Sequence, residues 1–155
     1  IENVLEAVRQ VNSDKVALYI AGEVQDKAYA SKLIDMKADI PNVIIKFEFL
    51  NDQELANSLF AADVVACPFS STLTSGSVIL AMTQGKALIL PESAKALDSI
   101  TPDGILTYTC QDELTNLIMK LDNEKLEEMG RINKHRAETF NWKMVGEQTV
   151  KAYSK

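Results

Sequence analysis

Short, almost continuous apolar runs alternate along the chain with stretches whose apolar residues recur at helical spacing. Residues 16–22 (VALYIAG) form such a run and end at a glycine, which is typical of a strand buried on both faces of a parallel sheet. Residues 1–11 place their apolar side chains three or four positions apart, which predicts a helix. The same patterns predict further strands at 43–50, 63–69, 86–91 and 105–109, and further helices at 26–38, 52–61, 78–85, 111–121, 123–138 and 143–153.

This order of elements predicts an α/β fold in which helices connect the strands of one sheet. Repeated strand–helix–strand units are right-handed and parallel, and they place helices on both faces of the sheet. We therefore expect residues 1–155 to form a single Rossmann-like domain with a parallel sheet of about five strands. Ligands of such sheets bind beside the carboxyl ends of the strands, so a site is expected in the loops that follow them.

The composition excludes several classes of protein. The 155 residues are 46% hydrophobic and 25% charged, as in an ordinary globular domain, so wholesale disorder is excluded. The 22 acidic and 16 basic side chains give a net charge of −6, which argues against a nucleic-acid partner bound through its phosphates. The longest uncharged run, 64–85, contains Pro68 and six Ser or Thr residues between 70 and 77, so it is not a transmembrane segment.

The residue types that most often carry chemistry are few and scattered. Cys67 and Cys110 stand far apart without a C-x-x-C motif, so we expect reduced thiols, with Cys67 in a core strand, and no zinc site. His135 is the only histidine and lies in a charged late helix, which indicates a surface residue rather than a catalytic base. The chain also lacks the G-x-G-x-x-G and G-x-x-x-x-G-K-[ST] motifs of two nucleotide-binding classes.

One loop stands out, the serine- and threonine-rich segment 70–77 between a predicted strand and a buried helix. A helix N-terminus presents unpaired N–H groups and the positive end of a dipole, both of which suit a phosphate. Gly76 would let a ligand approach the backbone, and Lys86 is the only charged residue between 64 and 91. A second interpretation stays open, in which Ser75 simply caps the helix and the segment is uncharged because it is core.

Six groups of segments follow one another in the order of a known family: 1–8 with 16–22, 43–50 with Glu54-Leu55, 61–65, 76–90 with Ala81-Met82 and Gly85-Lys86, Asp103-Gly104, and 140–142 (FNW). Together they resemble the C-terminal, donor-binding domain of GT-B fold glycosyltransferases, particularly the retaining enzymes of group 1, or family 4, that use nucleotide-sugars. The resemblance implies the C-terminal half of a larger, two-domain glycosyltransferase. It implies a nucleotide-sugar substrate, such as a UDP- or GDP-sugar, with no cofactor and no metal.

The resemblance also implies which residues bind the donor, although it assigns no catalytic residue. The base pocket would be lined by Gly22, Glu23, Phe49 and Leu50. The diphosphate would be held by Thr74, Ser75, Gly76 and Ser77. For Phe49, stacking on the base and packing in the core are both open interpretations.

Departures from the family pattern bear on activity. The E-x7-E glutamates, which in the family contact the donor sugar and the ribose, would fall on Leu73 and Ala81, and neither is a carboxylate. The family's first strand, with its Arg and Lys, is missing, so only Lys86 and helix dipoles are expected to neutralise the diphosphate. Glu92 could replace a lost ribose contact, and Trp142 either joins helices that reach the other domain or anchors packing.

The missing strand also has a consequence for the sheet. In the family it lies at the centre, so its absence would leave two neighbouring strands with unpaired edges. We expect the sheet to close this gap directly or to borrow a strand from a neighbouring chain. A six-stranded sheet built from these residues alone would contradict that expectation.

These observations lead to a preferred function and two alternatives. The domain is expected to bind a nucleotide-sugar donor for transfer to a glycan or lipid-linked acceptor in surface or capsular polysaccharide biosynthesis. The acceptor would bind through the N-terminal domain, so the isolated piece is expected to be inactive; the full-length protein is expected in the cytoplasm, free or peripheral to the inner membrane. The first alternative is a non-catalytic GT-B-derived binding or assembly domain that has lost the glutamates. The second, a sugar-nucleotide epimerase, is less favoured because the loops offer no acidic or histidine base.

Overall fold

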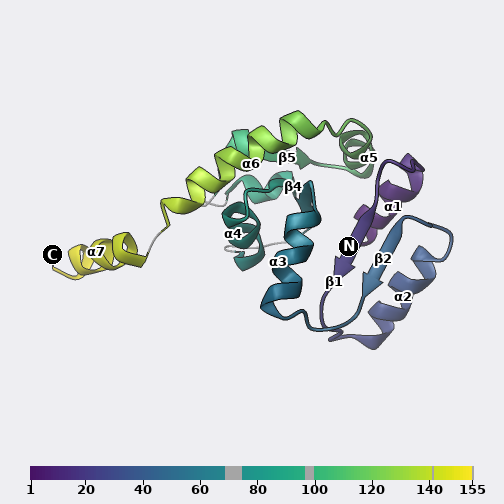
Figure 1. Ribbon diagram of the computed structural model, residues 1–155, viewed down its shortest axis with the longest axis horizontal. Coiled ribbons are helices and arrows are strands. Elements are labelled where there is room, and N and C mark those ends of the chain that lie inside the picture. Colours follow the sequence, from purple (N-terminus) through teal and green to yellow (C-terminus); the bar gives the residue numbers. More distant parts are fainter. Residues whose placement is uncertain (69–74, 97–99, 141, 155) are drawn as a thin grey trace. The chain divides into compact units, whose positions relative to one another are not determined.

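The computed structural model describes residues 1–68, 75–96, 100–140 and 142–154 of the chain (Figure 1). The chain divides into two compact units. Unit 1 consists of Ile1–Ala61 and Thr107–Leu121, and unit 2 consists of Ala62–Leu106 and Asp122–Lys155. Each unit has buried apolar residues of its own, and the expectation of a single domain stays a prediction.

Unit 1 is built on two parallel strands. Strand β1 (Leu18–Ala21) pairs with β2 (Val43–Lys46), and Leu18 lies opposite Val43. Both strands are shorter than predicted. For β2 the reason is that residues 47–51 form the connection to the next helix instead of continuing the strand. The helices of the unit, all at predicted places, are α1 (Glu2–Val11), α2 (Lys27–Lys37), α3 (Asp52–Ala61) and α5 (Gln111–Met119).

Helix α1 is central to the packing of unit 1 because its apolar residues share one face. Val4, Leu5 and Val8 are buried at helical spacing, and α1 packs against both α5 and α2. At the rim of this contact, the Tyr29 hydroxyl of α2 donates to Oε2 of Glu2 at 2.7 Å. The apolar stripe predicted for residues 1–11 is therefore the surface that holds these helices together.

One face of the unit 1 sheet is exposed. Val43 is 1% exposed, whereas Tyr19 and Ile44, which lie opposite each other in the register, are 44% and 61% exposed. The prediction that residues 16–22 form a strand buried on both faces is therefore wrong. A continuous apolar run has the same sequence pattern whether or not a second layer covers it, so the pattern alone does not separate the two cases.

Unit 2 contains the second sheet, in the order β3-β4-β5. Strand β3 (Val64–Ala66) runs parallel to β4 (Ala87–Pro91), and β5 (Ile105–Tyr108) begins in this unit. The predicted polar connection 92–104 contains two short 3-10 helices, at Glu92–Ala96 and Pro102–Gly104. The remaining helices are α4 (Gly76–Thr83), α6 (Asn123–Glu138) and α7 (Trp142–Tyr153).

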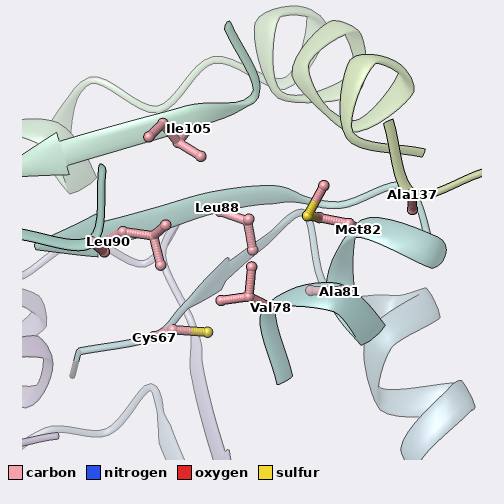
Figure 2. Packing of buried hydrophobic residues seen from close by; sticks show 9 residues of the cluster. Cys67, Val78, Ala81, Met82, Leu88, Leu90, Ile105 and Ala137 are labelled. Carbon is pink, nitrogen blue, oxygen red and sulfur yellow. The ribbon is translucent and has the colours of Figure 1, made fainter. Parts of the chain in front are cut away.

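The core of unit 2 forms around β4, whose side chains from Ala87 to Leu90 are at most 2% exposed. Figure 2 shows Leu88 close to Val78 and Met82 of α4. The predicted strand at 86–91 is confirmed, and its burial on both faces is typical of a covered parallel sheet. Other members of this core are Cys67, Ala81, Leu90, Ala94, Ile105 and Ala137.

Helix α6 fits against this core at two places where only a glycine leaves room. A Cβ atom at Gly130 would overlap the backbone oxygen of Gly85, and one at Gly104 would overlap the Asn133 side chain. Asn133 is fully buried, and its Nδ2 donates to the backbone oxygens of Lys86 and Gly104, both at 2.8 Å. The helix thereby donates hydrogen bonds to carbonyl groups just before β4 and β5.

The described strands form two sheets instead of the single sheet expected. A sheet is continuous only where neighbouring strands exchange hydrogen bonds. Among the described residues, β1 and β2 form one sheet and β3, β4 and β5 form the other. The expectation that the sheet closes its gap directly is therefore wrong, and the borrowed strand stays a prediction. The fold class is confirmed as α/β and Rossmann-like, with parallel pairing in both units.

Candidate functional site

The residues predicted to line a base pocket lie in two adjacent loops of unit 1. Gly22 and Glu23 directly follow β1, and Phe49 and Leu50 lie in the connection after β2. Because β1 and β2 are parallel, both loops leave the same edge of the sheet, and the Gly22 N–H donates to the backbone oxygen of Lys46 at 3.2 Å. The structure thus brings the starts of these two loops together at the carboxyl ends of the strands.

The exposure of Phe49 distinguishes between its two interpretations. Its side chain is 77% exposed, so packing of this aromatic in a core is excluded. An exposed ring on a loop offers a flat apolar face on which a nucleobase can stack. Stacking stays a prediction, and it is the interpretation that the exposure leaves open.

Sequence reasoning missed the group that holds this loop. Glu54, in the first turn of α3, forms an ion pair with Lys46 and exchanges hydrogen bonds with Asn51. Hydrogen bonding to Lys46 is the main cause that lowers the pKa of Glu54, followed by the backbone hydrogen bond from Asn51. The spacing Asn51-x-x-Glu54 before a helix is the signature of a capping box and could have revealed part of this group.

The described residues predicted to hold a diphosphate lie at the start of α4 in unit 2. Ser75 is the N-cap of α4, and its hydroxyl oxygen accepts a hydrogen bond from the Val78 N–H at 3.3 Å. Gly76 and Ser77 follow in the first turn, and both are exposed. The capping role of Ser75 is thus confirmed, and Thr74 lies outside the described residues.

Lys86 does not lie where the expected phosphate contact requires it. Its Nζ donates to the backbone oxygen of Ala62 at 2.7 Å, and the two residues lie just before β4 and β3 respectively. They are therefore at the amino ends of the strands, whereas α4 starts after the carboxyl end of β3. The eight residues of α4 separate Lys86 from Ser75 by roughly 12 Å along the helix. The expectation that Lys86 neutralises a bound diphosphate is wrong.

The carboxyl end of β4 leads directly into the first 3-10 helix of unit 2. This helix, Glu92–Ala96, begins with the residue proposed as a substitute ribose contact. It also contains Lys95, which sequence reasoning overlooked although it follows a strand at the expected edge. The backbone therefore places one acidic and one basic residue of the sequence at the edge where ligands of parallel sheets bind.

The structure describes only one of the two positions at which the family's glutamates would fall. Ala81 is fully buried in the core of unit 2, on the same helix as Val78 and Met82. A carboxylate there would be desolvated, so this position serves packing in the present chain. Leu73 lies outside the described residues.

The described surroundings of the remaining candidate residues indicate no catalytic or ligand-binding role. His135 is 88% exposed and lies 3.7 Å from Glu138, which confirms a surface position. Cys67 is buried, and burial raises the pKa of its thiol to about 11, whereas Cys110 is exposed at the N-cap of α5. Trp142 is the first residue of α7, and its side chain lies outside the described residues.

Two searches of the described part of the chain gave negative results. No group of three or more His, Cys, Asp or Glu residues in it is arranged to hold a metal ion. None of its helices has the length and apolar character needed to cross a membrane.

Comparison with known proteins finds similar folds. No family model matches the sequence, and no curated protein is significantly similar to it. The crystal structure of TarM matches 98% of this chain, with a TM-score of 0.74 and 17% identity, and sucrose-phosphate synthase from Thermosynechococcus elongatus matches 99%, with a TM-score of 0.77 and 17% identity. The chain spans only 32% and 41% of these two proteins, respectively. Both are GT-B glycosyltransferases, so the chain has the fold of one half of a GT-B glycosyltransferase, as the resemblance predicted.

Proposed function

We propose that this chain is the donor-binding part of a glycosyltransferase. It binds a nucleotide-sugar, such as a UDP- or GDP-sugar, whose sugar is transferred to a glycan or lipid-linked acceptor in surface or capsular polysaccharide biosynthesis. The acceptor binds to another part of the protein, which works in the cytoplasm, free or peripheral to the inner membrane. The similar structures support the reaction class, since both proteins are glycosyltransferases.

The observation that carries this proposal is the open start of α4. A Cβ atom added to Gly76 would meet no atom of the described residues within 4 Å, so their arrangement lets a ligand approach the backbone there. The first turn of α4 contains no acidic residue, so its positive dipole end is not opposed by a charge of its own helix. N–H groups of an exposed first turn are suited to the oxygens of a diphosphate.

The leaving diphosphate also needs positive charge as the bond to the sugar breaks. We assign this role to Lys95, because the 3-10 helix that contains it directly follows the carboxyl end of β4. Lys86 is the matched control, since it lies at the opposite ends of the strands. In this proposal, Lys95→Met lowers the affinity for a nucleoside diphosphate and Lys86→Met does not.

A second function is supported by the positions of the expected glutamates. One of them corresponds to Ala81, which is packed in the core of unit 2, so the ribose contact of the family cannot be made from this position. The alternative is therefore a GT-B-derived domain that binds a nucleotide or a partner protein without transferring sugar. Sugar release from a labelled nucleotide-sugar, measured beside nucleotide binding, distinguishes the two functions.

A pair of glycine substitutions tests the diphosphate site without disturbing the fold. Gly76→Ala adds a methyl group where the ligand is proposed to approach, and Gly146→Ala adds one in α7, where a Cβ would likewise meet no atom of the described part of the chain within 4 Å. We expect calorimetric titration with UDP and GDP to show weaker binding for Gly76→Ala and unchanged binding for Gly146→Ala. Absence of nucleotide binding by the native protein at millimolar ligand would contradict the proposed function.

A further inference from the structure

We infer that Lys46 and Glu54 are positioning residues, whose ion pair holds residues 47–51 in the conformation that presents the Phe49 ring for stacking on a nucleobase. This inference rests on the proposed function, because it concerns how the loop after β2 would bind the base of the proposed nucleotide. It assigns a role to two residues that touch no ligand themselves. Their effect on binding is therefore expected to pass through Phe49.

The first support is the way in which one carboxylate joins the two ends of the loop. Oε1 of Glu54, in the first turn of α3, lies 2.9 Å from Nζ of Lys46, the last residue of β2. Oε2 of the same carboxylate accepts a hydrogen bond from the Asn51 N–H at 3.0 Å. The last residue of the strand and the last residue of the loop are thus bound to the same side chain.

The second support is that contacts occur on both sides of Phe49. Before it in the chain, Oε2 of Glu48 lies 3.4 Å from Nζ of Lys46. After it, Oδ1 of Asn51 accepts a hydrogen bond from the Glu54 N–H at 2.9 Å, which completes the capping box. The aromatic residue lies between these two contacts in the chain and is 77% exposed. The connection is therefore held at several points, while its large apolar side chain faces solvent.

The third support is the small contribution that such an exposed ion pair makes to global stability. The side chains of Lys46 and Glu54 are 31% and 42% exposed, and ion pairs at that exposure contribute little to global stability because water screens them. A loop that is ordered before binding loses less conformational freedom when its ligand arrives. The pair is therefore better suited to setting the geometry of the loop than to stabilising the fold.

Four variants and two probes test the inference. Lys46→Met removes the ion pair, and Lys32→Met is the matched control, because Lys32 forms a similar exposed pair with Glu2 at 3.1 Å in the same unit. Phe49→Ala removes the ring, and the fourth variant combines Phe49→Ala with Lys46→Met. The probes are a nucleoside diphosphate, UDP or GDP, and inorganic pyrophosphate, which lacks the base. Affinities are measured by calorimetry on the intact protein, and folding is checked by urea unfolding.

We expect Phe49→Ala to weaken nucleoside diphosphate binding about tenfold, as is usual for loss of a stacking ring, and to leave pyrophosphate binding unchanged. Lys46→Met is expected to weaken nucleoside diphosphate binding about threefold, again without effect on pyrophosphate, and Lys32→Met is expected to have no effect. In the double variant, Lys46→Met should add nothing to Phe49→Ala, because interacting sites are not additive. A purely structural role would lower affinity for both probes.

The possible failures are distinguishable. If Phe49→Ala weakens nucleotide binding but Lys46→Met behaves as Lys32→Met does, the positioning role is overturned and the proposed function stands. Equal loss for both probes, or full additivity in the double variant, also overturns the positioning role. If the native protein binds neither UDP nor GDP, the proposed function fails and the inference fails with it.

Discussion

The two sheets of this chain differ in how far their apolar side chains are buried. In unit 2, Leu88 and Leu90 of β4 are fully buried, whereas in unit 1 Tyr19 and Ile44 are largely exposed although both strands are apolar in sequence. Burial of apolar surface is the main favourable term in folding, so substitutions in β4 are expected to be costly. Substitutions of the exposed residues of unit 1 are not expected to carry that cost. The loop with Phe49 belongs to the same unit.

The polar contacts of the helices show the same contrast. In unit 1, partly exposed charges tie α1 to α2, as in Glu2 with Lys32 at 3.1 Å, and to the residues just after α2, as in Arg9 with Asp39 at 3.1 Å. In unit 2, α6 is tied to the sheet by the buried, neutral amide of Asn133. Exposed ion pairs respond to pH and salt, whereas a buried amide does not titrate. The two units should therefore respond differently to the same change in conditions.

The largest expected difference is in thiol reactivity. Burial raises the pKa of Cys67, in unit 2, from 9.0 to about 11, which lowers its thiolate fraction near neutral pH about a hundredfold, whereas Cys110 in unit 1 is exposed. In the native protein we expect Cys110 to react with a thiol reagent at least about a hundredfold faster. Cys67→Ala and Cys110→Ala assign the two rates. Equal rates would mean that the core of unit 2 opens readily.

A matched pair of isoleucines tests the difference in burial directly. Ile89, in β4, is 2% exposed, and Ile44, in β2, is 61% exposed. Ile89→Ala should lower the free energy of unfolding by about 2–5 kcal/mol, and Ile44→Ala by less than about 1 kcal/mol. Urea unfolding of both variants provides the measurement. A large loss for Ile44→Ala would show that a further layer covers the exposed face in the intact protein.

The buried amide is expected to have a somewhat smaller effect. Asn133→Ala leaves the backbone oxygens of Lys86 and Gly104 without their side-chain donor and should cost about 1–3 kcal/mol in the free energy of unfolding. Asn57→Ala is the control, since Asn57 is also helical and hydrogen-bonded, to Gln53, but exposed. The control also corrects for the greater helix propensity of alanine. Similar losses in both variants would argue against a special role of the α6 contact.

The smallest expected effect depends on pH. A hydrogen bond from its own backbone N–H, followed by hydrogen bonds from Tyr29 and Lys32, lowers the pKa of Glu2 from 4.5 to about 2. Since the folded-state pKa lies below the unfolded-state value, the ionised carboxylate stabilises the fold above pH 4.5, and this contribution disappears as the pH falls toward 2. Glu2→Gln should therefore be less stable by under about 1 kcal/mol at neutral pH, because the pair is partly screened. The difference should close between pH 4.5 and 2 in urea midpoints; a constant difference would contradict the assignment.

Most helices and strands could be predicted because their signals are local. Asp52 to Ala61 forms a helix where its apolar spacing and acidic start indicate one, and Gly85, with a φ of +67°, ends the turn after α4 as its sequence position suggests. The end of β2 at Lys46 was not predicted. Apolar residues continue to Leu50, interrupted only by Lys46 and Glu48, but residues 47–51 form the connection to α3, and Lys46 pairs with Glu54 at its far end.

The candidate site was predictable only in part. Ser75 and Gly76 were found from the sequence because a helix N-terminus has a recognisable local pattern. Lys86 was misplaced because closeness in sequence to that helix says nothing about which end of the strands it occupies. The exposure of Phe49 could not be predicted either, since an aromatic residue after an apolar run looks the same whether it is buried or exposed.

The sequence by itself determined the order and type of the elements, the acidic balance of the chain and the capping residue of α4, because each depends on composition or on neighbours a few positions away. The tertiary structure alone decided that the strands form two sheets, that Phe49 is exposed, and that Lys86 binds Ala62 at the amino ends of the strands. The physical reason is that burial and hydrogen-bond partners depend on which distant segments meet. Strand pairing joins residues such as Leu18 and Val43, whose contact no local pattern encodes.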